Sequence, residues 1–199
     1  MFKRLLMTTT LLFSLSLADE PLKIGIEGAY PPFSYVTPDR SLAGFEVDLA
    51  NLFCEKMERE CLIVQTDFDA LIPSLNSKRI DAILASMSIT DVRKEAIDFS
   101  NKYYQTPARF TVPKGSKIEI SEEGLKGKVI GVQSGTIHET YMNDNFKKIA
   151  TIRSYRNLDD GMFDLDSGRI DLIFADVVAV DTGYLQKEYG ETLEFIGPE

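Results

Sequence analysis

Histidine, cysteine and long apolar runs are all scarce in this sequence. His138 is the only histidine, and the aspartates between Asp159 and Asp166 do not have the spacing of a calcium loop. The sequence therefore predicts no metal site and no cofactor. After the first eighteen residues, no stretch approaches the ~20 apolar residues that a membrane-spanning helix needs.

Residues 1–18 have the pattern of an export signal. Lys3 and Arg4 provide a positive start, and a short, mostly apolar run follows over residues 5–17. Ser16-Leu17-Ala18 then offers the small residues that a signal peptidase requires at its cleavage site. We expect a mature chain that begins near Asp19 and works outside the cytoplasm.

Basic residues are few relative to acidic ones. Without the export signal, 20 Lys and Arg stand against 31 Asp and Glu, which gives a formal charge of about −11. Such a surface repels phosphate backbones and anionic lipid headgroups, so we expect neither nucleic-acid nor membrane-surface binding. It would attract small cations, although acidic residues also simply keep secreted proteins soluble.

The two cysteines, Cys54 and Cys61, are compatible with a disulfide because exported proteins fold in an oxidising compartment. Seven residues along an intact helix rise ~10.5 Å, which exceeds the ~7 Å Cα separation that a disulfide tolerates. If the two cysteines pair, the helix that carries Cys54 must end and the chain must turn back near residues 58–60. The small loop favours a structural staple over a redox role.

An internal repeat points to two similar halves. Residues 75–83 (LNSKRIDAI) recur as residues 165–173 (LDSGRIDLI), and each copy predicts a helix end, a polar turn and a short strand. Short strands rich in β-branched residues open the two halves at residues 23–28 and 129–135. This β–α–β pattern favours parallel sheets covered by helices, although chance convergence on a common helix–turn–strand unit would look similar.

The two halves should meet near Tyr104–Pro113. Residues 105–107 interrupt the helical pattern, and Arg109–Val112 predicts an extended segment that crosses between the halves. We therefore expect lobe one over residues 19–107 and lobe two over residues 108–196.

Polar side chains stand where the predicted strands end. Glu27 and Gln133 hold matching places after the two opening strands, and Ser86 and Asp176 follow the two repeated strands. In open parallel sheets, ligands bind beyond the carboxyl ends of the strands. Turn formation could explain one or two of these polar residues, but core packing does not explain all four.

Two predicted helix starts add charge complementarity. Either Thr90 or Asp91 can cap a short helix that carries Arg93. Thr136 and Glu139 have the spacing of a capping box, so a second helix should start there. Free N–H groups at this helix start and the fork of Arg93 suit a carboxylate, whereas Asp176 suits an ammonium group. An α-amino acid carries both groups.

Two aromatic residues lie beside these polar groups. Tyr30 follows the first strand and Phe68 precedes a predicted helix. Aromatic rings that flank an aliphatic or guanidinium side chain bury it and add ~0.5–2 kcal/mol of cation–π attraction. For Phe68 alone, ordinary core packing is the alternative.

Five stretches together resemble a known family. They are residues 26–33 (IEGAYPPF), 44–49 (GFEVDL), 68–75 (FDALIPSL), 88–93 (SITDVR) and 168–171 (GRID). In order and spacing they are similar to the periplasmic amino-acid-binding proteins of ABC importers, most of all the lysine/arginine/ornithine-, histidine- and arginine-binding members. The resemblance runs over about residues 22–197, and the cysteine pair falls where the basic-residue binders carry their disulfide.

The resemblance implies a fold, a partner and a mechanism. The fold is α/β, a two-lobe type II periplasmic binding protein with parallel-rich sheets and a hinge. The protein would be a periplasmic monomer that closes on an amino acid as its small-molecule ligand and then docks on the permease subunits of the importer. The implied ligand-binding set is Glu27, Tyr30, Phe68, Ser86, Ser88, Arg93, Gln133, Thr136, Ile137, His138 and Asp176.

The resemblance also implies a role for most of these residues. Arg93 would bind the α-carboxylate, helped by the helix start at Thr136, and Asp176 with the two serines would hold the α-ammonium. The two aromatic rings would enclose the side chain, and Glu27 would meet its distal positive charge. Because Glu27 together with Gln133 and the only histidine resembles the arginine-type members, arginine is the expected ligand.

The chain departs from the family at three places. Ala85 stands where some members have serine, and Ile137 stands where several have threonine, so two side-chain hydrogen bonds are missing. The chain also stops at residues 197–199, about where family members begin a second crossing back to lobe one. We therefore expect a C-terminally truncated chain with an exposed apolar face on lobe one.

Other functions stay open. Some relatives of this fold are dehydratases or lyases, for which Glu27 could be the catalytic carboxylate, but Arg93 and Asp176 suit a zwitterion better and we expect no enzyme. A hydrolase built on Ser134 and His138 lacks a nearby acid and misses the spacing of a nucleophile elbow. A sensor or adhesin domain would use the same ligand site without transport.

Overall fold

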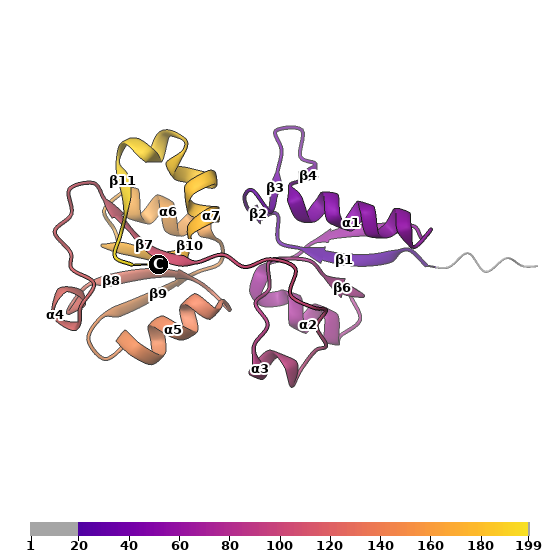
Figure 1. Cartoon of the computed structure of the whole chain (residues 1–199), viewed down its shortest axis with the longest axis horizontal. Coiled ribbons are helices and arrows are strands. Elements are labelled where there is room, and N and C mark those ends of the chain that lie inside the picture. Colours follow the sequence, from indigo (N-terminus) through magenta and orange to yellow (C-terminus); the bar gives the residue numbers. More distant parts are fainter. Residues whose placement is uncertain (1–19, 199) are drawn as a thin grey trace, which may run out of the picture.

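The computed structural model describes residues 20–198, so the expected export signal lies outside the described residues. The chain forms two lobes, each with its own sheet, that lie side by side (Figure 1). An extended segment over residues 101–107, here called the crossover, leads from lobe one to lobe two. No helix in the described range is long and apolar enough to cross a membrane.

Lobe one is built on β1 (Leu22–Ile26), the central strand of a parallel sheet in the order β5-β1-β6. Helix α1 covers one face and α2 the other (Figure 1). Ile24 and Ile26 of β1 pack with Val47 and Ala50 of α1. A small antiparallel sheet, β2-β3-β4, follows β1. The further elements of lobe one are β2 (Ala29–Tyr30), β3 (Ser34–Val36), β4 (Leu42–Ala43), α1 (Phe45–Lys56), β5 (Cys61–Gln65), η1 (Phe68–Ala70), α2 (Leu71–Asn76), β6 (Ala82–Ile83) and α3 (Asp91–Lys94).

Lobe two is built on a five-stranded sheet in the order β11-β7-β10-β8-β9. Helices α5 and α6 cover its opposite faces. Met142 of α5 belongs to the core of one face, and Met162 and Leu165 of α6 belong to the core of the other. The elements are β7 (Ala108–Pro113), α4 (Glu122–Leu125), β8 (Val129–Gln133), α5 (Ile137–Phe146), β9 (Thr151–Tyr155), α6 (Leu158–Asp166), β10 (Leu172–Asp176), α7 (Val177–Val180), η2 (Asp181–Leu185), η3 (Glu188–Glu191) and β11 (Leu193–Ile196).

The sheet of lobe two is mixed, in agreement with the expected parallel-rich sheets. Strands β10, β8 and β9 are parallel, but β7 runs antiparallel to both β10 and β11. Ala108, the first residue of β7, pairs with Asp176, the last residue of β10. The crossover thus enters lobe two at the carboxyl end of β10, so β7 has to run in the opposite direction. The predicted crossing segment Arg109–Val112 is part of this strand, and the crossing itself lies just before it.

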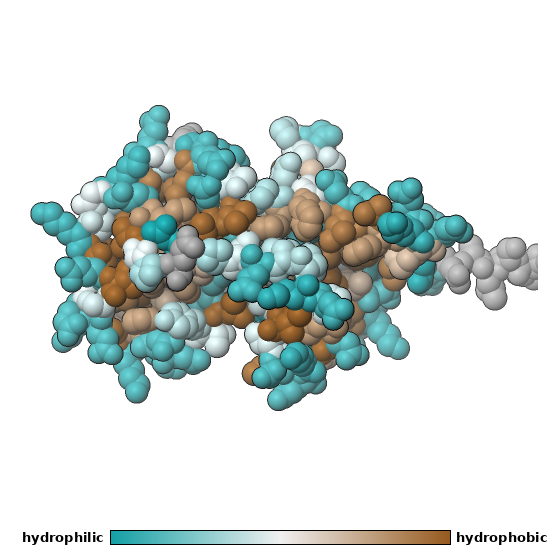
Figure 2. Space-filling view, in the orientation of Figure 1, coloured by the Kyte–Doolittle hydropathy of each residue, from teal (hydrophilic) through white to brown (hydrophobic). Residues whose placement is uncertain are grey.

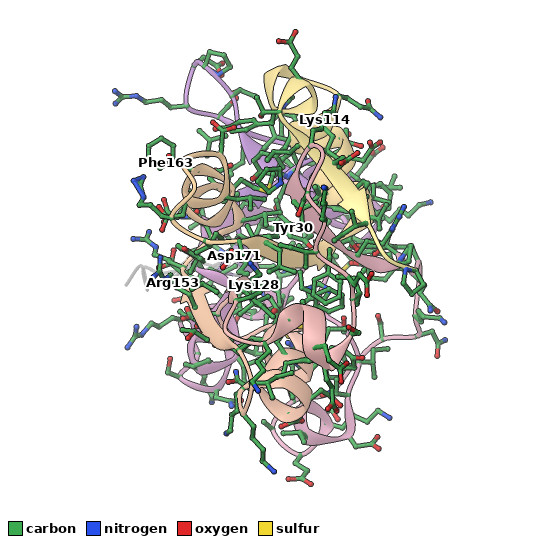
Figure 3. All side chains as sticks on the ribbon, turned by 90° about the vertical axis from the view of Figure 1, so that its left-hand side faces the viewer. Tyr30, Lys114, Lys128, Arg153, Phe163 and Asp171 are labelled. Atoms are coloured by element: carbon green, nitrogen blue, oxygen red, sulfur yellow. A yellow bond between two sulfur atoms is a disulfide. The ribbon has the colours of Figure 1, made fainter. Side chains whose placement is uncertain are left out.

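The internal repeat is confirmed down to its hydrogen bonds. In lobe one, the N–H of Asp81 donates to Lys23 O (2.7 Å), and the N–H of Lys23 donates to Asp81 Oδ2 (2.9 Å). In lobe two, the N–H of Asp171 donates to Val129 O (2.9 Å), and the N–H of Val129 donates to Asp171 Oδ2 (2.8 Å). In Figure 3, Asp171 lies beside Lys128, with which it also forms an ion pair (3.3 Å). One helix–turn–strand unit is therefore used twice, and its aspartate holds the start of the strand that leads to the cleft.

The predicted disulfide is confirmed. Cys54 and Cys61 are bonded, with their Cα atoms 6.0 Å apart. Helix α1 ends at Lys56, and Glu58 takes a left-handed conformation (φ 50°) that reverses the chain. The bond therefore ties the end of α1 to the start of β5, at the end of lobe one that is far from the crossover (Figure 1).

We predict that Asp81→Ala and Asp171→Ala each lower the free energy of unfolding by about 1–3 kcal/mol, because each leaves a backbone N–H without its carboxylate acceptor. Chemical denaturation followed by circular dichroism measures this. Asp144→Ala, which removes an exposed aspartate of α5, is the matched control and should change the stability by less than about 0.5 kcal/mol. If all three variants unfold alike, the two aspartates do not stabilise their strands.

Candidate functional site

The ends of β1 and β8 meet between the two lobes. Glu27 directly follows β1, and Gln133 is the last residue of β8. The Nε2 of Gln133 donates to Glu27 Oε1 across the gap (2.5 Å). Both side chains are buried, with 6% and 4% of their surface exposed. The two matching strand ends therefore form one polar contact between the lobes.

Two adjoining cavities surround this contact. The inner cavity, of about 30 Å³, is lined by Glu27, Tyr30, Phe68, Ala85, Ser86, Ser88, Arg93, Gln133, Thr136, Ile137 and His138. The outer cavity, of about 890 Å³, shares with it Tyr30, Ala85, Ser86, Ser88, Ile137 and His138, and it adds Asp176. The structure thus gathers the whole expected ligand-binding set, with Asp176 reached only from the outer cavity. Tyr30 lies near the centre of the molecule in Figure 3. In Figure 2, hydrophilic residues project from the outer margins of both lobes.

Burial makes Glu27 a weak acid. Desolvation raises its pKa to about 7, and the negative charges of Glu46, Asp159 and Asp67 act in the same direction. The hydrogen bond from Gln133 lowers the pKa, but by less than burial raises it. Near neutral pH this carboxyl therefore exists in both protonation states, and a cation beside it would hold it ionised.

Arg93 spans the two lobes. Helix α3 starts after Thr90, whose side chain accepts from the N–H of Arg93 (3.2 Å), so Thr90 is the cap that the sequence proposed. The Arg93 guanidinium donates to Ser88 O (2.7 Å) in its own lobe and to Gly135 O (2.8 Å) in lobe two. Its central carbon lies 5.6 Å from the ring centroid of Phe68. Among residues 20–198, these bonds use two of its five N–H donors, which leaves three that a ligand can engage.

Phe68 and Tyr30, which the resemblance places on either side of the ligand's side chain, differ in their surroundings. Phe68 is buried in the core of lobe one with Leu71 and Ile80 and also stacks under Arg93, so packing and site roles coexist. Tyr30 stacks on Phe33, with ring centroids 5.9 Å apart, and lines both cavities. Of these two aromatic residues, Tyr30 borders both cavities and Phe68 borders the inner one.

Helix α5 starts at Ile137, as the capping spacing predicted. The Thr136 side chain accepts from the N–H of Glu139 (3.2 Å). Glu139 reaches back to the N–H of Gly135 (2.7 Å) and not to that of Thr136, so the reciprocal half of the capping box is shifted by one residue. Gly135 has φ 73°, and a Cβ there would lie 2.9 Å from the Cβ of Asp69 in lobe one. The main chain of lobe two therefore touches lobe one beside the site.

His138 is a neutral, half-buried residue of the site. Its ring meets Phe174 edge to face, with centroids 5.5 Å apart. Burial, and then the positive charge of Arg93, lower its pKa to about 4. Ser134 donates to Asp69 Oδ2 (3.2 Å), and no hydrogen bond joins it to His138 among the described residues. The geometry therefore gives no support to a Ser134–His138 hydrolase.

Asp176 and Ser86 are each held by neighbouring groups. Asp176 caps α7 by accepting from the N–H of Ala179 (2.9 Å), and it also accepts from the hydroxyl of Thr106. Ser86, in a left-handed conformation (φ 51°), donates through both its N–H and its hydroxyl to Glu46. Both residues border the outer cavity, one from each lobe.

Comparison with known proteins agrees with this geometry. Residues 22–163 match the profile of the bacterial extracellular solute-binding proteins, family 3. The chain belongs to this family. It is 44% identical over 183 residues to the L-arginine-binding protein of Pseudomonas aeruginosa, covering 92% of this chain and 71% of that protein.

Two further comparisons of this family 3 member point the same way. It is 39% identical over 203 residues to the lysine/arginine/ornithine-binding periplasmic protein of Escherichia coli, covering 98% of this chain and 78% of that protein. Its structure superposes with a TM-score of 0.85 and 31% identity on an ancestral arginine-binding protein bound to arginine, covering 90% of this chain and 80% of that one. The two-lobe type II fold implied by the resemblance is thereby confirmed.

Sequence reasoning missed three residues of this family 3 member whose side chains form hydrogen bonds with Ser86 or Asp176. They are Glu46, Tyr104 and Thr106. Glu46 carries a weak signal, because it shares the buried face of α1 with Val47 and Ala50 and is an acid among apolar residues. Nothing in the local sequence marks the other two, since their roles depend on where the crossover lies between the lobes.

The only histidine of the chain allows a direct test of the site's electrostatics. We predict that the ring resonances of His138 titrate with a midpoint near pH 4 instead of the ordinary ~6.5, because burial and Arg93 oppose a second positive charge. Proton NMR of the folded protein measures the midpoint. Arg93→Gln should move it upward but keep it below the ordinary value, since burial is the larger cause. A midpoint of 6.5 in the unmodified protein would contradict this description.

Proposed function

We propose that this protein binds a cationic L-amino acid, arginine first, in the periplasm and delivers it to the permease subunits of an ABC importer. The observation that carries the proposal is the convergence of Glu27, Arg93 and Asp176 on two adjoining cavities between the lobes. The relatives named above are binding proteins for arginine and related basic amino acids, which supports the same ligand class here. We also propose that the chain acts as a monomer without enzymatic activity.

The charges of the three residues complement those of arginine. Arginine carries one carboxylate and two cationic groups, and the site offers one cation and two carboxyl groups. Arg93 has free donors for the carboxylate, and Asp176 accepts the α-ammonium together with Ser86 and Ser88. Glu27, at the far side of the inner cavity, accepts the guanidinium, which suits a carboxylate bidentately. A neutral amino acid would leave Glu27 buried without a cation.

The size of the inner cavity implies opening and closure. A volume of about 30 Å³ holds one or two waters, whereas sites for small ligands usually measure ~300 Å³ or more. The Glu27–Gln133 and Arg93–Gly135 bonds close the gap between the lobes. We infer that the lobes part by bending at the crossover, admit the ligand, and close when ligand contacts to both halves replace these bonds.

One observation favours a second candidate, an enzyme on the same fold. A carboxyl with a pKa of about 7 in a cleft is what a general acid or base requires. A cationic ligand provides another reason for the same burial, and Arg93 with Asp176 accounts for both backbone charges of an amino acid. Incubation with prephenate-like or peptidoglycan substrates, followed by NMR, distinguishes the two, since turnover would favour the enzyme.

We predict that Arg93→Ala and Asp176→Ala each abolish arginine binding in isothermal titration calorimetry. Removing one partner of a buried charged pair leaves the ligand's charge without compensation, which costs about 2–5 kcal/mol. Arg79→Ala, at an exposed turn of lobe one, is the control and should bind as the unmodified protein does. Near-normal binding by either site variant would remove the assignment.

We predict that arginine binding weakens about tenfold when the pH falls from 8 to 6, because Glu27 takes up a proton through its pKa of about 7 and loses the charge that attracts the guanidinium. His138, with a pKa of about 4, stays neutral over this range. Calorimetry at pH 6, 7 and 8 measures the effect. Glu27→Gln should bind arginine weakly at every pH and glutamine little changed. Equal losses for the two ligands would point to a neutral natural ligand.

A further inference from the structure

We propose that Glu46, Tyr104 and Thr106 are positioning residues that restrict Ser86 and Asp176 to accepting hydrogen bonds from the ligand's α-ammonium group. None of the three belongs to the expected ligand-binding set. The inference rests on the proposed function, because it explains how one part of that site selects a donor-only group.

Ser86 has its donor used before any ligand arrives. A serine hydroxyl offers one donor and two acceptor lone pairs. The Ser86 hydroxyl donates to Glu46 Oε1 (3.0 Å), and the hydroxyl of Tyr104 donates to Ser86 Oγ. One lone pair remains. Ser86 can therefore accept from an ammonium group but cannot donate to a carboxylate.

Glu46 stands in the first turn of α1 and is completely buried. Its Oε1 accepts from the N–H and the hydroxyl of Ser86 and from the hydroxyl of Tyr103 (3.2 Å). Within the described part of the chain, its Oε2 has no hydrogen-bond partner. A buried carboxyl with one oxygen left unpaired costs stability. Its Oε1 nevertheless joins Ser86 to Tyr103 of the crossover, so the buried carboxyl holds the two segments that border this part of the site.

Asp176 also has positions left for a ligand. A carboxylate offers about four lone-pair positions. The N–H of Ala179 and the hydroxyl of Thr106 occupy one on each oxygen. The remaining positions suit the ammonium group. Thr106 can therefore keep its bond while the ligand is bound, and it holds the carboxylate in one orientation.

The hydroxyls that orient Ser86 and Asp176 belong to Tyr104 and Thr106 of the crossover. In an extended chain, side chains two residues apart lie on the same side. Tyr104 reaches Ser86 in lobe one, and Thr106 reaches Asp176 in lobe two. All four residues border the outer cavity. The segment that joins the lobes thus also places the two ammonium acceptors relative to each other.

The test compares Thr106→Val, which replaces the hydroxyl by a methyl group of similar size, with Thr106→Ser, which keeps the hydroxyl. Calorimetry should show arginine binding weakened about tenfold or more in Thr106→Val, because a hydrogen bond to a charged group is lost. Thr106→Ser should bind within about threefold of the unmodified protein. Equal affinity in all three proteins would overturn the role of Thr106.

A second ligand separates positioning from general damage. 5-Guanidinopentanoate is arginine without its α-ammonium group, and its weaker binding is measured by competition at high concentration. Thr106→Val should change the affinity for this analogue less than about twofold, since the lost bond acts only through the ammonium site. If arginine and the analogue lose affinity equally, Thr106 has only a structural role and the inference fails.

The lobe-one half of the subsite has its own variants, which decide the question if Thr106→Val does not fold. Tyr104→Phe should weaken arginine about three- to tenfold and leave the analogue unchanged. Glu46→Gln keeps an acceptor for Ser86 and should bind arginine nearly normally, whereas Glu46→Leu should not. Wild-type affinity in both Tyr104→Phe and Glu46→Leu would overturn this half.

Failure of the positioning role can be distinguished from failure of the proposed function. If Arg93→Ala and Asp176→Ala bind arginine normally, the site assignment itself is wrong. If those two abolish binding while Thr106→Val, Tyr104→Phe and Glu46→Leu bind arginine as the unmodified protein does, only the positioning role is overturned.

Discussion

The architecture of the cleft depends on one buried acid that needs a partner from the opposite lobe. Glu27 lies where β1 ends, away from water and near the negative charges of Glu46, Asp159 and Asp67. No basic side chain bonds to it within the described residues, and its hydrogen-bond donor there is Gln133 of lobe two. Water or a cationic ligand would stabilise the ionised carboxylate of Glu27 more than one amide donor does. The free energy of Glu27 therefore changes with the separation of the lobes and with what lies between them.

The repeated helix–turn–strand unit explains why the polar groups face each other. In each lobe the same aspartate holds the same strand start, so the opening strands and the strands beside them end at corresponding places. The hydrogen bonds that hold these strands are thus the same in both lobes, whereas the residues that follow the strands differ. Glu27 corresponds to Gln133, and Ser86 corresponds to Asp176. Two similar lobes consequently present unlike charges to a ligand that is itself asymmetric.

Much of this arrangement could be predicted because it follows from local rules. The ends of β1 and β8, the cap at Thr90 and the turn between Cys54 and Cys61 each depend on a few neighbouring residues. The antiparallel course of β7 could not be predicted this way, because its direction is set by where the crossover enters lobe two. The same holds for Thr106 and Tyr104, whose partners lie 70 and 18 residues away.

Gly135 has a consequence for selectivity. Its main chain lies against Asp69 of lobe one, so protein atoms limit how far the two lobes can close. When contact between the lobes limits closure, the cleft between them has the same width for every ligand. Ligands that differ in length by one methylene group then contact the same cleft walls. The polar groups at the inner end of the cleft, and not its width, distinguish between them. Any side chain introduced at this glycine would collide with Asp69 and keep the two lobes from closing fully.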